Sequence, residues 1–182
     1  MTTKRITLFL LSATAVVLFL MTSSANAEET HLTPNQAEYI SSVCKTIEPS
    51  LTQLHSNDAL LRVNVGQNYE SIGTRLLNRF SARVQFNNLN NSNLVTANDE
   101  YDKSLVLFRN AYRDYEVSLS ELIALDCQKE PTRFFNTLEN TRSKRQTVRQ
   151  QVEAVNAQLQ IFMDTVNQFE EGYRTVAGQN GS

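Results

Sequence analysis

The sequence predicts an all-α protein, an elongated antiparallel three-helix bundle with coiled-coil-like heptad packing. Three observations support this fold class. Apolar residues recur in alternating steps of three and four over most of the chain, a spacing that keeps one face of a helix against a partner. Helix breakers are scarce, with five glycines and three prolines in 182 residues. The strict alternation of apolar and polar residues that is typical of strands is not found along the sequence.

The first 27 residues have the pattern of a secretory signal peptide. Lys4 and Arg5 precede an apolar run from Ile6 to Met21, and small residues follow up to Ala27. We therefore expect cleavage after Ala27 and a secreted or extracytoplasmic protein of the cell envelope. The apolar run is shorter than the ~20 residues that a spanning helix needs, but an uncleaved N-terminal membrane anchor is the alternative.

Removal of the signal would leave 155 residues, with 15 Lys and Arg against 19 Asp and Glu and a formal charge of −4. This size predicts a single domain. We divide it into an N-terminal extension at 28–33, the bundle at 34–177 and a flexible C-terminus at 178–182. A mildly acidic chain gives no general attraction to nucleic acid or to an anionic membrane. We expect a protein partner or self-association, with membrane contact only through an uncleaved signal segment.

The first predicted helix begins at Pro34 and extends past residue 80. Thr33 and Gln36 have the spacing of a capping box, and Pro34 takes the first helical position, where an N–H would have no partner. Pro49 lies inside the helical pattern and removes a backbone hydrogen bond, so we expect a kink there. The stretch NVGQN at 64–68 is a second weak point.

The second and third predicted helices are more regular. The asparagine-rich stretch FNNLNNSN at 86–93 predicts a turn, because asparagine accepts left-handed backbone conformations. The second helix follows at about 94 to 126, and the short link CQKEP makes it antiparallel to the third. The third helix opens at Pro131 or Thr132 and closes at Gly178. Its seam is Phe134, Leu138, Thr141, Arg145, Val148, Val152, Val155, Leu159, Phe162, Val166, Phe169, Tyr173 and Val176.

The two cysteines, Cys44 and Cys127, fall at the same end of this bundle. Thiols are oxidised outside the cytoplasm, and two cysteines permit one intramolecular disulfide. The alternative is two separate buried thiols. For the cysteines to face each other, the chain should reverse near residue 85 or 86, whereas the asparagine cluster centres on residue 90. A kink at Pro49, or a first helix that ends before residue 82, must absorb the difference.

Asp58 and Arg145 are polar interruptions in otherwise apolar seams, and alignment at the cysteines places them at similar heights. A charge that faces a core needs a partner, so we expect the two to form a pair that fixes the register, with Tyr112 nearby. The alternative is that Arg145 extends along its stem to solvent and Asp58 marks a local helix break.

A basic stretch, TRSKRQTVR at 141–149, contains Arg142, Lys144 and Arg149. It is a candidate patch for an anionic polymer or headgroup, and the alternative is a solvated face balanced by acidic residues of the first helix. His31 and His55 have no further ligands at metal-binding spacing, and no phosphate loop or nucleophile elbow is found in the sequence. We therefore expect no catalytic residues, no metal and no cofactor, and we do not expect an enzyme.

Two resemblances bear on function. LTPNQ at 32–36 resembles the LTxxQ motif of Spy/CpxP-type periplasmic chaperones, small exported helical proteins that shield unfolded clients. QLHSNDALLRVNVGQNYESI and LDCQKEPTRFF resemble uncharacterised secreted helical proteins of Saccharibacteria-like bacteria, a likeness that covers most of the mature chain and implies no activity. We expect an exported, non-enzymatic helical structural or protein-interaction module of the cell envelope or extracellular space. The alternative is a Spy/CpxP-like extracytoplasmic holdase chaperone.

Overall fold

The computed structural model describes residues 31–89 and 92–179, and nearly all of them are helical. No strand occurs in these two ranges, so the prediction of an all-α protein is confirmed. The elements in chain order are α1 (Pro34–Leu61), the π-helical turn η1 (Arg62–Gly66), α2 (Gln67–Ser71), a second π-helical turn η2 (Ile72–Leu77), α3 (Asn78–Phe86), α4 (Ser92–Ala124) and α5 (Pro131–Gln179). The elements from α1 to α3 follow one another without a gap, and we call them together the first helical segment.

Several predictions concern residues outside the described ranges. These are the signal peptide, the cleavage after Ala27, residues 28–30 of the N-terminal extension, residues 90–91 of the predicted turn and residues 180–182 of the C-terminus. α5 itself continues to Gln179, two residues beyond the predicted end of the bundle at 177. Along residues 31–89 and 92–179, no helix combines the length and the apolarity that a bilayer crossing requires.

The ends of the first helical segment follow the local sequence. The Thr33 N–H donates to Gln36 Oε1 at 2.9 Å and the Gln36 N–H donates to Thr33 Oγ1 at 3.4 Å, which confirms the capping box. At the other end Asn88 adopts a left-handed conformation with φ of 54°, and the Leu89 N–H donates to the Val84 carbonyl at 3.2 Å. This closing bond satisfies a carbonyl that the helix end leaves free.

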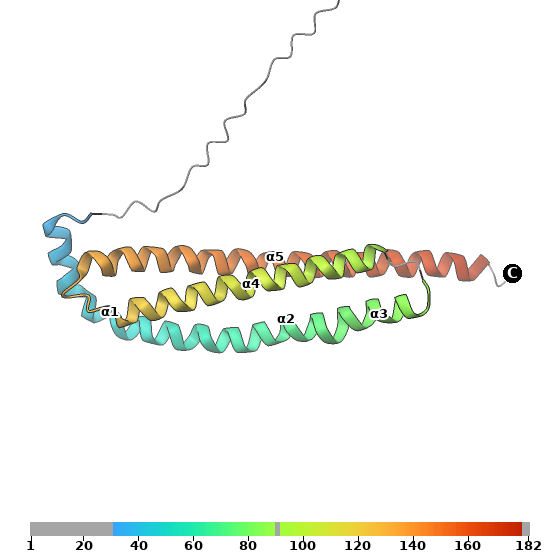
Figure 1. Cartoon of the computed structure of the whole chain (residues 1–182), viewed down its shortest axis with the longest axis horizontal. Helices are drawn as coiled ribbons and strands as arrows, with labels where there is room; N and C mark the ends of the chain where they lie inside the picture. Colours follow the sequence, from blue (N-terminus) through green and yellow to red (C-terminus); the bar gives the residue numbers. More distant parts are fainter. Residues whose placement is uncertain (1–30, 90–91, 180–182) are drawn as a thin grey trace, which may run out of the picture.

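α1 changes direction within its length, and Pro49 lies inside it (Figure 1). Proline has no N–H to donate and its ring displaces a carbonyl of the preceding turn, which accounts for a bend at this position. The first part of α1 crosses the ends of α4 and α5, and the rest of the first helical segment then runs along the molecule (Figure 1). The helix does not end before residue 82, since α3 reaches Phe86, and of the two alternatives the structure shows the bend in α1 (Figure 1).

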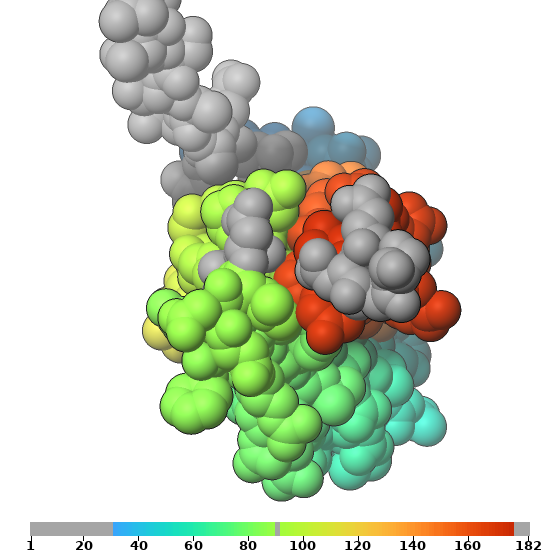
Figure 2. Space-filling model, turned by 90° about the vertical axis from the view of Figure 1, so that its right-hand side faces the viewer, coloured from blue at the N-terminus to red at the C-terminus, as the bar shows by residue number. Residues whose placement is uncertain are grey.

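α4 and α5 lie alongside each other over most of α4, and α2, η2 and α3 lie beside them (Figure 1). An end-on view shows the same three neighbours, with α3 and the start of α4 in green and α5 in red (Figure 2). α5 extends beyond the ends of α3 and α4 (Figure 1). Tyr173 and Val176 in this extension are exposed.

Two groups of buried side chains hold these elements together. One group is centred on Tyr101, Leu105, Phe108, Val155 and Phe162, and the second contains Cys44, Tyr112, Tyr115, Leu119, Leu122, Cys127 and Phe134. Val148 is half-buried and packs against both groups. The site described next lies in this middle region of the molecule.

Candidate functional site

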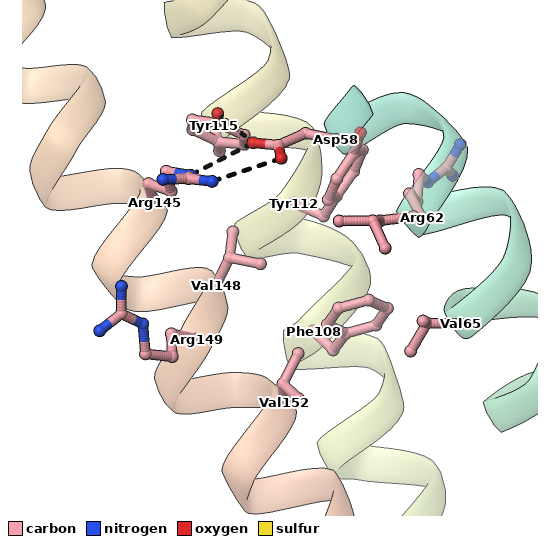
Figure 3. A pocket seen from close by; sticks show the side chains of 11 residues that line it. Asp58, Arg62, Val65, Phe108, Tyr112, Tyr115, Arg145, Val148, Arg149 and Val152 are labelled. Atoms are coloured by element: carbon pink, nitrogen blue, oxygen red, sulfur yellow. Dashed lines mark hydrogen bonds and ion pairs between the residues drawn. The ribbon is translucent and has the colours of Figure 1, made fainter. Parts of the chain in front are cut away.

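A pocket opens between the first helical segment, α4 and α5. Its volume is about 310 Å³, at the lower end of the range for small-molecule sites. Figure 3 shows the side chains that line it, and they come from all three parts of the fold. They are Asp58, Leu61, Arg62, Val65, Phe108, Tyr112, Tyr115, Arg145, Val148, Arg149 and Val152.

The pocket lies where the first helical segment loses its regular α-helical form. η1 supplies Arg62 and Val65 to the wall, and none of the five η1 residues is buried. A π-helical turn places more residues in a turn than an α-helix does, and such turns occur frequently at functional sites. The predicted weak point at 64–68 overlaps this turn. Because η1 does not pack tightly onto α4 and α5, space remains between them.

Asp58 lies at one end of the pocket and is the centre of a polar group. Tyr115 Oη donates to Asp58 Oδ2 at 2.6 Å. Arg145 donates through Nε to Asp58 Oδ2 at 3.2 Å and through Nη2 to Asp58 Oδ1 at 3.3 Å (Figure 3). The Asp58 side chain is 11% exposed, whereas that of Arg145 is 48% exposed. Burial raises the pKa of Tyr115, and its hydrogen bond to the Asp58 carboxylate raises that pKa further. Tyr115 is therefore a hydroxyl donor throughout the physiological range.

The structure thus brings together Asp58 and Arg145, the two charges of the predicted pair. Tyr112 lies nearby, as predicted, in the lining of the same pocket, but the tyrosine that bonds Asp58 is Tyr115, while Tyr112 donates to Glu116 Oε1 at 2.7 Å. Tyr112 and Tyr115 are three residues apart on α4 and both are buried, so their spacing alone did not distinguish them.

Sequence reasoning also missed the polar contacts around Tyr112. The Arg62 guanidinium lies 5.1 Å above the centre of the Tyr112 ring, a cation–π arrangement. Glu116 accepts from Tyr112 on one oxygen and lies 3.1 Å from His55 Nε2 with the other. Tyr112 and Glu116 are one helical turn apart, and this spacing is the signal in the sequence that could have predicted their contact.

The cysteines lie away from the pocket, at the end where α1 crosses the other helices. Cys44 and Cys127 form a disulfide with their Cα atoms 6.1 Å apart, and both residues are buried. Close by, Ser41 Oγ donates to the Gln128 carbonyl at 3.1 Å. These bonds fasten the first part of α1 to the link between α4 and α5.

The residues of the predicted anion patch do not form one site. Arg142 pairs with Glu139 on its own helix at 2.5 Å. Lys144 precedes Arg145 and is therefore rotated by about 100° around the helix axis. Of the three, only Arg149 lines the pocket. The structure thus places Arg149 with Arg145 at the pocket and leaves Arg142 and Lys144 outside it.

In the described ranges, no group of three or more His, Cys, Asp and Glu side chains could hold a metal ion. Comparison of the chain with protein-family models, with curated proteins and with solved structures finds no match.

Proposed function

We propose that the chain is an exported, non-enzymatic helical module that binds another protein in the cell envelope or outside the cell. Its proposed architecture is an antiparallel three-helix bundle with coiled-coil-like heptad packing. The close packing of α4 on α5 and the alternating seams support this architecture. The signal-like sequence at 1–27 and the Cys44–Cys127 disulfide support export, because disulfides persist outside the cytoplasm.

One observation carries the proposal of a binding module. Four large apolar side chains are exposed within six residues: Leu60 at 63%, Leu61 at 59%, Val63 at 47% and Val65 at 36%. Single exposed apolar side chains are normal, but a concentration of them indicates an interaction surface. We call these four residues the apolar stretch, and two of them, Leu61 and Val65, also line the pocket.

Site-specific photocrosslinking in the native cell tests this role. A photoreactive residue at position 63 is expected to give one discrete adduct with a partner protein, and Leu60→Glu is expected to abolish it. Position 76 is the matched control, because Leu76 is 61% exposed on the same helical segment but lies outside the apolar stretch. Equal adducts from both positions, or an adduct that survives Leu60→Glu, would contradict the proposal.

The export part of the proposal has its own test. Protein recovered from outside the cytoplasm is expected to have Glu28 as its first residue, since cleavage after Ala27 is the predicted processing event. An N-terminus that still contains the apolar run would favour the membrane-anchor alternative.

A holdase chaperone is the second candidate, and the apolar walls of the pocket together with the apolar stretch support it. A holdase must bind many unrelated unfolded chains. It is therefore expected to suppress the aggregation of several unrelated model clients, and Leu60→Glu is expected to weaken that suppression. A partner-specific module is expected to crosslink to one protein and to leave such aggregation unchanged.

A further inference from the structure

The pocket beside η1 is polar at one end and apolar at the other. Figure 3 shows Asp58, Tyr115 and Arg145 together at the polar end, and Phe108 and Val152 toward the opposite end. We propose that this pocket binds a small amphipathic anion, that is, an apolar chain of about ten carbons with a single carboxylate or phosphate head. Leu61 and Val65 belong both to the pocket lining and to the apolar stretch, but the proposal is argued from the pocket alone and does not depend on the protein-binding role.

The charge of the lining favours an anion. Three arginines and one carboxylate line the pocket, which gives a formal charge of +2. The carboxylate, Asp58, is already paired with Arg145 and accepts the hydrogen bond of Tyr115. Within the described ranges, Arg62 and Arg149 form no ion pair.

Each of the two remaining guanidinium groups is suited to an anionic head. Each is a planar fork of donors that fits the paired oxygens of a carboxylate or a phosphate. Arg62 is held over the Tyr112 ring, which limits its freedom before a ligand arrives. Arg149 lies one turn after Arg145 on α5, and Figure 3 shows its guanidinium on the opposite side of the pocket from that of Arg62, so the two flank the pocket and a single head meets one of them at a time.

The remaining wall is suited to a hydrocarbon. Phe108 from α4, Val148 and Val152 from α5 and Val65 from η1 contribute apolar surface, and no titratable side chain lies among these four. The volume of about 310 Å³ equals that of about ten water molecules at ~30 Å³ each. A methylene group has about the volume of a water molecule, so a chain of about ten carbons fills the pocket and leaves its head at the edge, beside Arg62 or Arg149.

Decanoate labelled with ¹³C at the carboxyl carbon is the probe, and its NMR shift is followed as it is titrated, below its micelle concentration, into the full chain. We expect saturable binding of one molecule per chain. The double variant Arg62→Gln, Arg149→Gln is expected to bind about fivefold more weakly, because the head then finds no exposed charged partner at either edge. The matched control is Arg133→Gln, Arg142→Gln, which removes the same charge from exposed positions of α5 and should bind as the wild type does.

Further ligands and a pocket variant define the chemistry. Decyltrimethylammonium is expected to bind at least tenfold more weakly than decanoate, and a comparison with decyl phosphate identifies the preferred head group. Val65→Trp places a larger side chain at the pocket wall from a partly exposed position, so it is expected to abolish binding while circular dichroism shows an unchanged helix content. Binding that does not saturate, that survives Val65→Trp, that is as tight for the cation, or that falls equally in the control variant would overturn the proposal.

Discussion

Asp58 and its partners give the sharpest test of the site. Asp58→Ala removes the acceptor of the Tyr115 hydroxyl, and Tyr115 is only 2% exposed, so this donor would lose its partner in the core. A buried donor without a partner costs about 1–3 kcal/mol. Arg145 would also lose its partner, but its side chain is about half exposed and reaches water. We therefore expect Asp58→Ala to lower the free energy of unfolding by about 2–3 kcal/mol.

Arg145→Met is the complementary change. It leaves the Asp58 carboxylate with the Tyr115 hydrogen bond but without its cation. Breaking a fully buried pair costs about 3–5 kcal/mol, and exposed pairs are worth about 0.2–1 kcal/mol. Since this pair is buried on one side only, we expect an intermediate loss of about 1–2 kcal/mol.

Urea denaturation followed by far-UV circular dichroism measures both losses, and the double variant completes a thermodynamic cycle. A coupling energy of about 1 kcal/mol between Asp58 and Arg145 is expected. The reasoning is refuted if Arg145→Met costs more than Asp58→Ala, because the ion pair would then stabilise the fold more than the Tyr115 hydrogen bond does. It is equally refuted if the coupling is zero.

Three further predictions concern the rest of the fold. Reduction of the Cys44–Cys127 bond, which spans 83 positions, should lower the free energy of unfolding by about 4.5 kcal/mol if the disulfide acts by restricting the unfolded chain, and urea curves with and without reductant measure this loss. Burial raises the pKa of Tyr101 to about 12, so as the pH rises this hydroxyl loses its proton in the unfolded chain first. Unfolding curves across this range should show stability falling by up to about 3 kcal/mol, and Tyr101→Phe should flatten that decline. A Cβ at Gly73 would lie 3.1 Å from the Tyr101 ring, whereas one at Gly66 meets nothing closer than 3.8 Å, so Gly73→Ala should be less stable than Gly66→Ala by about 1–2 kcal/mol in the same urea assay. An equal or greater stability of Gly73→Ala would show that the Tyr101 ring yields freely.

The helices could be predicted from the sequence because each is fixed by local signals. The capping box at Thr33, the proline that opens α5 and the alternating apolar steps are all readable within a few residues. The two charges on the apolar seams, Asp58 and Arg145, were also readable, since a charge at a core position needs a partner.

The pocket could not be predicted, because it depends on how the helices sit against each other. The choice between Tyr112 and Tyr115 is decided by a modest rotation of α4, which the apolar pattern does not define. In a π-helical turn the backbone hydrogen bonds join residues five apart, whereas in an α-helix they join residues four apart. The composition of 62–66 does not distinguish these two patterns. The basic stretch at 141–149 looked like one patch in the sequence, whereas α5 distributes its side chains around the helix axis.

The disulfide has a mechanical consequence for the pocket. The first helical segment is tied near its start through Cys44 and, after α3, by the short connection to α4, so neither end can swing away from the other helices. Its freedom is confined to bowing outward at mid-length, where η1 is least packed. A ligand would therefore enter by outward bending of the middle of this segment while the disulfide and the connection to α4 hold its ends. The protein would keep its overall fold during binding and release.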